Sequence, residues 1–308
     1  METLENQGLT VRFRRPLTGL ILIACLLGLC AVSAAWGSSG PAGAHSVTRG
    51  SSYLALGDSV TFGFQDPSGG QRQDPYDVAA IVGYPELLAG QLHLTVANAS
   101  CPGESSTSMI NPAGKSDGCE DGINGYPNGY RSTYPLHVRY SGSQLGYGVA
   151  YLKAHRNVRL VTVQTGLVDL SLCQSLTPDE CASPSEIAAV DGTLQSNLDT
   201  ILLAIRDQAH YSGQIVVVNY YSSSYGRSLL TTLIRNINGV LSSTARSYGA
   251  KMADVYGAFA TASEHVGEDP CRARLLDVVS PGVCGYHATI AGQTVIANTI
   301  RKVIVVGK

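Results

Sequence analysis

A serine near the beginning of this 308-residue chain and a histidine near its end are the residues best suited to chemistry. Ser59 belongs to a Gly-Asp-Ser tripeptide directly after the apolar run at 53–56, and His287 precedes the last apolar-periodic stretch. A histidine can take the proton of a serine hydroxyl at neutral pH, and the serine oxygen then attacks a carbonyl carbon. Each motif alone is a weak signal, because Gly-Asp-Ser is also a common turn or helix N-cap and most histidines are packed or surface residues.

Two further polar segments follow apolar runs in the same way. Gly103 lies in a loop after the run at 94–98, where a glycine backbone can approach a ligand closely and donate its N–H. Asp169 lies in Gly-Leu-Val-Asp after the run at 159–164. We interpret Asp58 and Asp169 as structural residues that accept hydrogen bonds from loop backbone near the site. The chain has neither a phosphate-binding glycine loop nor a metal-ligand cluster, so we expect no cofactor and no metal.

The elements that position these residues alternate between short β-branched runs and longer helical stretches, which is typical of a parallel sheet covered by helices on both faces. Ligands bind beyond the carboxyl ends of such strands, where all four segments lie. The expected strands are Tyr53–Leu56, Leu94–Asn98, Arg159–Gln164, Gln214–Tyr220 and Lys251–Val255. The clearest helices are expected over Pro184–Asp207, Ser228–Tyr248 and Ile290–Ile304.

The segment between residues 102 and 143 has almost no periodicity and is rich in Gly, Asn, Ser and Tyr, which predicts a long surface excursion. Its tyrosines can line a lipid groove or a sugar platform, or they can simply pack the loop. These residues are Tyr126, Tyr130, Tyr134 and Tyr140.

Together the four segments resemble the SGNH (GDSL-type) hydrolase family in their order and position, from about Tyr53 to Ala297. The resemblance implies that Ser59 in GDSVTFGF is the nucleophile and that His287 in YHATIAGQTVIA is the general base. It also implies an oxyanion hole formed by the backbone N–H groups of Ser59 and Gly103. We therefore expect a three-layer α/β/α domain with a five-stranded parallel sheet in flavodoxin-like strand order.

The chain departs from the family pattern at two positions. The family's third motif is Gly-x-Asn-Asp, whose Asn donates to the oxyanion, and Val168 occupies that position here. The acid that orients the histidine normally stands three residues before it, where this chain has Cys284. A main-chain carbonyl near Val283 or Cys284 is the expected partner of the His287 ring, which would make a Ser-His dyad. Asp277 and Asp269 are possible substitutes. Both departures predict a lower rate.

The N-terminus has the features of an export signal. Arginines at positions 12, 14 and 15 precede an apolar run over residues 17–36, and small residues follow it. Cleavage is the preferred interpretation, with an uncleaved membrane anchor as the alternative. We therefore divide the chain into a leader with linker at 1–45 and one hydrolase-like domain at 46–308, secreted or at the extracellular face of the cell membrane.

Cysteine usage also favours export, since six cysteines remain after the leader and allow three disulfides. Fifteen pairings are formally possible, but short loops close most readily, and a zinc site lacks the ligand spacing. The preferred pairs are Cys101 with Cys119, Cys173 with Cys181, and Cys271 with Cys284. Similar paired cysteines occur in the family's secreted bacterial lipases and esterases.

Charge excludes one class of partner. The formal net charge is -2 and no Lys/Arg cluster follows the leader, so a nucleic-acid partner is not expected. The expected function is hydrolysis of a carboxylic ester of a lipid or an acylated sugar. The alternatives are an inactive or weakened surface protein that binds a glycan or lipid, and an O-acyltransferase.

Overall fold

The computed structural model describes residues 46–66, 73–121, 127–226, 228–280 and 283–307 of the chain. The predicted leader or anchor at 1–45 lies outside these residues, and so does Tyr126. Within the described ranges, no helix is both long enough and apolar enough to cross a membrane.

Five parallel strands form the central sheet, in the order β2-β1-β3-β4-β5, which confirms the predicted fold class and strand order. Their bounds are β1 Ser52–Leu56, β2 Thr95–Asn98, β3 Val158–Val163, β4 Gln214–Val218 and β5 Lys251–Ala253. Strands β1 and β4 are buried along their whole length, because helices cover both faces. Strands β4 and β5 end two residues earlier than predicted. The Asn219 side chain accepts the backbone N–H of Val255 there, and Asp254 caps the next helix.

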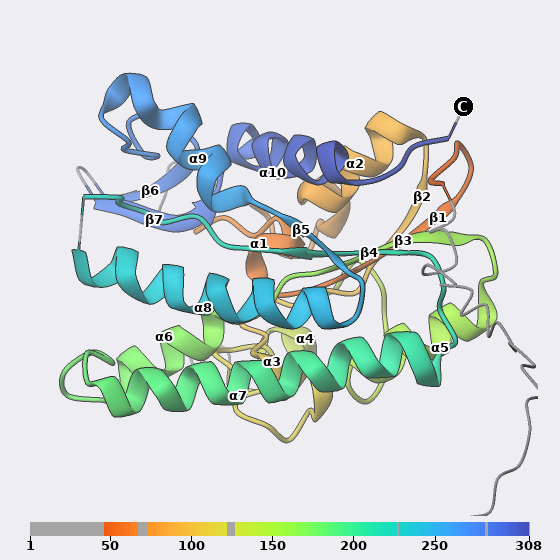
Figure 1. The fold of residues 1–308 in the computed structure, drawn as a ribbon, viewed down its shortest axis with the longest axis horizontal. Coiled ribbons are helices and arrows are strands. Elements are labelled where there is room, and N and C mark those ends of the chain that lie inside the picture. The colour runs from red at the N-terminus through yellow and green to blue at the C-terminus, as the bar shows by residue number, and fades with distance from the viewer. Residues whose placement is uncertain (1–45, 67–72, 122–126, 227, 281–282, 308) are drawn as a thin grey trace, which may run out of the picture. The chain divides into compact units, whose positions relative to one another are not determined.

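Helices form the two outer layers (Figure 1). One face carries α2 (Tyr84–Leu92), α9 (Val255–Ser263) and α10 (Ile290–Val303), and the other carries α5 (Gln144–Ala154), α7 (Pro184–Leu203) and α8 (Ser228–Ser247). The three helices predicted by periodicity are α7, α8 and α10. Helix α8 illustrates the cause: Leu233, Ile237 and Leu241 recur every four residues, and all three are buried. Helix α7 continues into a π-helical turn at Ala204–Gln208.

The shorter elements are helical turns and helix α6. They are α1 (Ser59–Phe62), α3 (Ser106–Ile110), α4 (Tyr130–Thr133), α6 (Leu167–Leu176) and the 3-10 turns Val78–Ala80 and Glu264–Val266.

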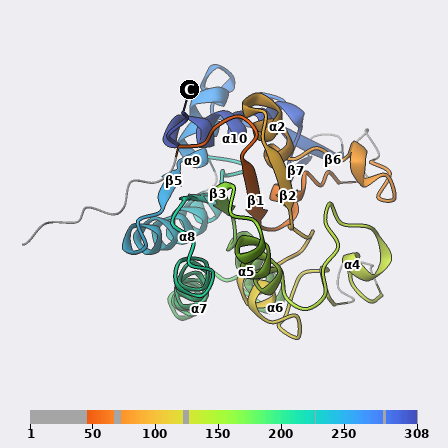
Figure 2. The ribbon, with the colours of Figure 1, turned by 90° about the vertical axis from the view of Figure 1, so that its right-hand side faces the viewer.

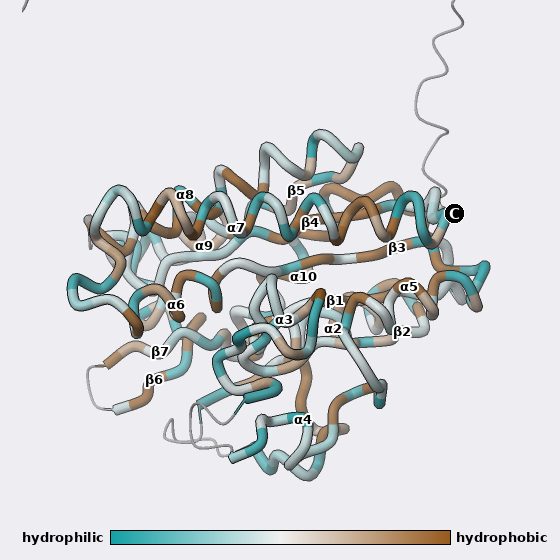
Figure 3. The backbone as a smooth tube through the Cα atoms, turned by 90° about the horizontal axis from the view of Figure 1, so that it is seen from below, coloured by the Kyte–Doolittle hydropathy of each residue, from teal (hydrophilic) through white to brown (hydrophobic). Residues whose placement is uncertain are grey.

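The excursion between residues 102 and 143 lies beyond the edge strand β2, where Figure 2 shows α4 at the side of the domain. It is less superficial than predicted, because its aromatic residues form a second small core. Tyr130 and Leu136 are buried there against Phe62 and Ile81, and the Cys101–Cys119 disulfide ties the segment to the end of β2. The residues around α4 are nevertheless mostly hydrophilic or neutral, drawn teal or pale in Figure 3, whereas the sheet and main helices contain hydrophobic stretches drawn brown.

A two-stranded antiparallel hairpin, β6 (Leu276–Ser280) with β7 (Val283–Ala288), was not predicted. His287 therefore lies in a strand, just before the last helix that the periodicity predicted. The residues between Leu276 and Ala288 are short alternating runs on either side of a Pro-Gly dipeptide, which is a usual turn signal in sequences. The hairpin contacts α1, and in Figure 1 the two lie on the same side of the domain.

All six cysteines of the domain are bonded in the preferred pairs. The pairing follows sequence proximity, as loop-closure entropy favours. One bond anchors the excursion, one closes the end of α6, and the Cys271–Cys284 bond fastens β7 to the segment before β6.

Candidate active site

The first component of the site is the turn between β1 and α1, which presents Ser59. Gly57 is required there, since an added Cβ would lie 2.1 Å from the Thr61 hydroxyl. Asp58 caps α1 by accepting the backbone N–H of Val60 at 2.9 Å, and it also accepts the Tyr220 hydroxyl. Burial raises the pKa of Asp58 to about 6, although these hydrogen bonds oppose the shift. The turn therefore holds Ser59 half-buried above a fully buried support.

Beneath this turn, Gln144 at the start of α5 bonds both backbone groups of Gly57. Its Oε1 accepts the Gly57 N–H at 2.6 Å, and its Nε2 donates to the Gly57 carbonyl at 3.0 Å. The same Nε2 lies 3.0 Å from a carboxylate oxygen of Glu104, whose other oxygen accepts the Ser108 hydroxyl. Burial, reinforced by the nearby Glu120 carboxylate, raises the pKa of Glu104 to about 8. A buried polar chain thus connects the loop after β2 with the nucleophile turn.

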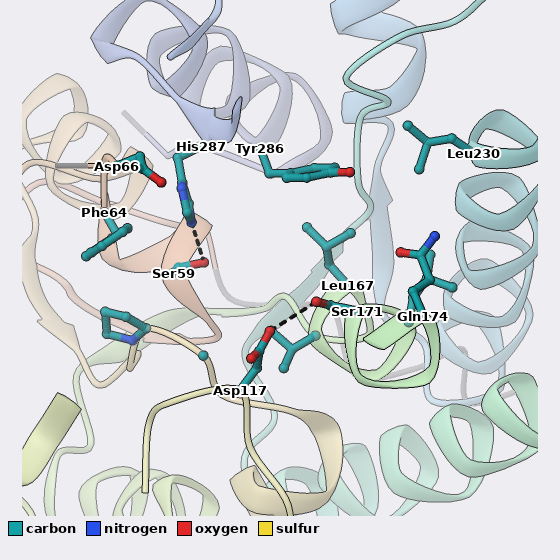
Figure 4. Close-up of a pocket in the computed structure, with 14 residues that line it drawn as sticks. Ser59, Phe64, Asp66, Asp117, Leu167, Ser171, Gln174, Leu230, Tyr286 and His287 are labelled. Atoms are coloured by element: carbon teal, nitrogen blue, oxygen red, sulfur yellow. Dashed lines mark hydrogen bonds between the residues drawn. The ribbon is translucent and has the colours of Figure 1, made fainter. Parts of the chain in front are cut away.

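The histidine approaches Ser59 from the hairpin. The Nε2 atom of His287 lies 3.1 Å from Ser59 Oγ, within hydrogen-bond reach. The ring also makes an edge contact with Phe64, with centroids 4.9 Å apart. Figure 4 shows His287 pointing at Ser59, with Phe64 and Asp66 beside it. The structure therefore brings together two residues that are 228 positions apart in the sequence.

A carboxylate stands behind the histidine. Asp277 in β6 is buried, and its Oδ2 lies 3.8 Å from His287 Nδ1, an ion-pair separation longer than a hydrogen bond. Its Oδ1 accepts the backbone N–H of His287 at 3.3 Å, and its Oδ2 accepts that of Asp66 at 2.9 Å. Asp269, the other carboxylate considered, caps a turn by accepting the Arg272 N–H. Among the described residues, the His287 ring has no hydrogen bond to the main-chain carbonyls near 283 and 284, so the expected carbonyl partner is not found.

Desolvation dominates the protonation of His287. Burial lowers its pKa below the usual histidine value, while the charges of Asp277 and Asp66 oppose the shift. The imidazole is therefore neutral at pH 7, which is the form able to accept a proton.

Ser59 and Gly103 both line the same pocket. Gly103 has a φ of +82°, and an added Cβ would lie 2.3 Å from the Asp117 carbonyl, so only glycine fits this loop. Val168, at the second position of α6, also lines the pocket and presents no hydrogen-bond donor from its side chain.

Asp169 is not among the residues that line the pocket. Its carboxylate accepts the backbone N–H of Ser106 at 2.9 Å and the Ser106 hydroxyl at 2.6 Å. It therefore joins α6 to the start of α3, while Asp58 joins α1 to the end of β4.

The pocket has a volume of about 510 Å³ and a mixed lining. Apolar side chains from α6 and α8, including Leu167, Val168 and Leu230, form one wall, and Ser171 donates to Asp117 at 3.0 Å near its floor. Figure 4 shows Tyr286 and Leu230 on the side away from Asp66. This size and lining suit a small organic group next to the serine.

Sequence reasoning missed several residues that support the site. Gln144 lies outside every motif. Glu104 directly follows Gly103 in the second motif, but no role was assigned to it. Asp66 follows the nucleophile motif closely, but its role depends on the hairpin that was not predicted. Asp277 was named, together with Asp269, as a possible partner of His287, and the pairing of β6 with β7 is what brings it there.

A serine and a histidine in contact at the carboxyl edge of a doubly covered parallel sheet are typical of serine-dependent hydrolases. The family model of the GDSL-like lipase/acylhydrolase family matches residues 55–294. The chain belongs to this family, and at the general level it is an esterase- or lipase-type protein.

Solved structures of low sequence identity share the fold. An extracellular lipase from Streptomyces rimosus is 20% identical, with 82% of this chain and 99% of that chain covered and a TM-score of 0.50. A phospholipase A1 from Streptomyces albidoflavus is 18% identical, with the same coverages and TM-score. A catalytic mutant of an acetylxylan esterase from Geobacillus stearothermophilus is 14% identical, with 84% of this chain and 95% of that chain covered and a TM-score of 0.51. No curated protein matches the chain.

Proposed function

We propose that this protein is an exported carboxylic ester hydrolase in which Ser59 is the nucleophile and His287 the general base. The observation that carries the proposal is the 3.1 Å contact between Ser59 Oγ and His287 Nε2 inside the pocket. His287 takes the serine proton as Oγ attacks the ester carbonyl, and it then returns that proton to the leaving alcohol. Water attacks the resulting acyl-serine with His287 again as base, and the carboxylic acid leaves.

Asp277 completes this proposal as the orienting acid in place of the carbonyl that the sequence suggested. Its carboxylate is held by two backbone N–H groups, so it has a fixed position behind the imidazole. A negative charge 3.8 Å from Nδ1 stabilises the imidazolium that forms when His287 accepts a proton. A small adjustment on substrate binding would bring the two atoms within hydrogen-bond distance, as catalytic contacts often tighten in the complex.

The oxyanion is assigned to the backbone N–H groups of Ser59 and Gly103. With Val168 in the family's Asn position, one donor is missing, and a single donor is worth about 10² to 10³ in turnover in other acyl-transfer enzymes. We therefore propose an active but slow hydrolase. Export is supported by the three disulfides, which persist in oxidising compartments.

The test is hydrolysis of p-nitrophenyl esters of short and long acyl chains by the domain from residue 46, alongside Ser59→Ala and His287→Ala. Each variant is expected to lose turnover by a factor on the order of 10⁴ or more, because the two residues act as a unit. Equal turnover in the parent protein and both variants, with all three folded and oxidised, would show that the pocket only binds ligands. Acyl transfer to an added alcohol in preference to water would instead indicate an acyltransferase.

A further inference from the structure

A second concave surface lies in the excursion, apart from the catalytic pocket. It has a volume of about 530 Å³ and is lined by Tyr76, Tyr140, Arg139 and residues 131–136. We call it the tyrosine groove. It shares no lining residue with the pocket at Ser59.

Two tyrosine rings, the exposed Tyr76 and the partly buried Tyr134, lie together at the surface of this groove. The Tyr76 side chain is 68% exposed, although large aromatic side chains are usually covered. Its ring packs edge-on against Tyr134, with centroids 5.0 Å apart and planes at 70°, and its backbone N–H is fixed by Asp74. The pair therefore presents an ordered aromatic surface to solvent.

The polar groups around these rings suit hydrogen bonding more than binding of a strong anion. Arg131 is already paired with Glu120 at 2.8 Å and stacks over Tyr140, so most of its charge is offset. Arg139 is exposed and has no ion pair within the described ranges, and Ser132 and Thr133 are exposed beside it. The Ser132 and Thr133 hydroxyls donate to the Gly129 carbonyl, so their oxygens remain as acceptors. Within the described ranges, the rim thus offers the Arg139 guanidinium as a donor and two hydroxyl oxygens as acceptors.

A continuous row of rings connects the tyrosine groove with the catalytic histidine. Tyr134 contacts Tyr130 at 5.1 Å, Tyr130 contacts Phe64 at 6.1 Å, and Phe64 contacts His287 at 4.9 Å. Because Tyr130 is fully buried, this packing fixes the groove relative to the reacting atoms.

We propose that the tyrosine groove binds the sugar residues of a glycan whose acyl ester enters the catalytic pocket. A sugar ring has an apolar C–H face that stacks on an aromatic ring and a rim of hydroxyl groups that pair with groups such as those of Arg139, Ser132 and Thr133. A lipid chain would instead require a continuous apolar lining, which the arginines and hydroxyls interrupt. This inference rests on the proposed esterase function for the identity of the ester, but the binding of sugar does not.

The binding test uses the full-length oxidised chain with Ser59→Ala, which prevents turnover of the probe. Soluble acetylated xylan, pectin and chitosan oligosaccharides are titrated by calorimetry, and phosphatidylglycerol vesicles are titrated in parallel. Adding Tyr76→Ala is expected to weaken binding of at least one glycan about tenfold, which is the loss of one aromatic contact of about 1.4 kcal/mol. Tyr76→Phe should retain the affinity, and Arg246→Ala on the exposed end of α8 serves as the control.

Three results would overturn the proposal: no binding to any of these glycans, binding that Tyr76→Ala leaves unchanged, or Tyr76-dependent binding to vesicles alone. The hydrolysis assay separates this inference from the proposed function. With Ser59 restored, Tyr76→Ala should keep p-nitrophenyl acetate turnover and raise KM only for the acylated glycan that binds. If the parent protein hydrolyses nothing, the esterase proposal fails while the binding titration remains a valid test of the groove.

Discussion

Ser59 and His287 are held by two different kinds of structure. The nucleophile turn belongs to the sheet, and its neighbours Asp58, Gln144 and Glu104 are fully buried and hydrogen-bonded. The histidine belongs to a hairpin outside the five-stranded sheet, where Val278, Val283 and Tyr286 are exposed. A few individual interactions hold the hairpin in place. They are the Cys271–Cys284 disulfide, the Asp277 hydrogen bonds, and a hydrogen bond from the Tyr221 hydroxyl to the Tyr286 carbonyl.

This difference separates stability from activity. Changes beneath Ser59 alter buried interactions of the main core, so they should act mainly on the free energy of unfolding. Changes in the hairpin should reduce turnover by displacing His287 while most of the core remains intact. Four measurements test this separation.

The largest effect is expected at Asp277. Asp277→Asn removes the charge behind His287 and places an amide where two backbone N–H groups donate, so the ring loses its orientation. We expect kcat to fall by about 10² to 10⁴, the upper end being the loss seen when the triad aspartate of a serine protease becomes asparagine. Because Asp277 raises the pKa of His287, the acidic limb of the kcat/KM profile should also move to lower pH.

Asp269→Asn is the matched control, since Asp269 caps a turn and does not contact the histidine. Equal losses in both variants would show that Asp277 acts through folding alone. The main-chain carbonyl near residue 283 or 284 would then again be the proposed partner of the His287 ring.

The next largest effect is an increase in turnover, expected from a substitution at Val168. Val168→Asn places an amide donor at the family's third oxyanion position, near the start of α6. Turnover should rise by up to about 10², since one donor contributes about 10² to 10³ in related chemistry. Val168→Ala shortens the same side chain without adding a donor and should give no rise. A fall in kcat with Asn, at unchanged stability, would mean that position 168 does not face the oxyanion.

The contrast between the sheet and the hairpin also separates the features that could be predicted from the sequence from those that could not. The five strands, their order, the three long helices and all three disulfides follow from periodicity, family resemblance and loop length, because they depend on short-range pattern or on topology shared by many proteins. Gln144 and Asp277 are different, because each becomes part of the site only through a contact across 87 or 10 residues. A side-chain contact of this kind leaves no periodic trace in a single sequence.

Removing the hairpin's covalent tether should have a smaller effect on turnover. The double variant Cys271→Ser, Cys284→Ser opens a 13-residue loop, which costs about 3 kcal/mol of stability in the chain-entropy account. It should also lower kcat about tenfold at a temperature where the protein is folded, since β7 carries His287. The double variant Cys173→Ser, Cys181→Ser opens an 8-residue loop at the end of α6 and should lose slightly less stability. If the two variants lose the same fraction of kcat, the hairpin is not positioned by its disulfide.

The smallest effect on turnover is expected at Glu104 beneath the nucleophile turn, where the change should be confined to stability. Its pKa is raised to about 8, so between about pH 4.5 and 8 the folded protein keeps a proton that the unfolded chain releases. This group therefore stabilises the fold less and less as pH rises through that window.

Glu104→Gln cannot ionise, and its free energy of unfolding relative to the parent should rise by up to about 1.4 kcal/mol per pH unit. Asp58, whose pKa is also raised, titrates in both proteins and largely cancels in this difference. Glu120 raises the pKa of Glu104, so its own titration changes with the substitution and forms part of the measured difference. Urea unfolding at pH 5, 6.5 and 8 measures it, with Glu264→Gln as an exposed control. A parent-variant difference that is constant across these pH values would show that Glu104 is ionised throughout, and that the support beneath Ser59 contains a buried charge instead of a neutral hydrogen-bonded chain.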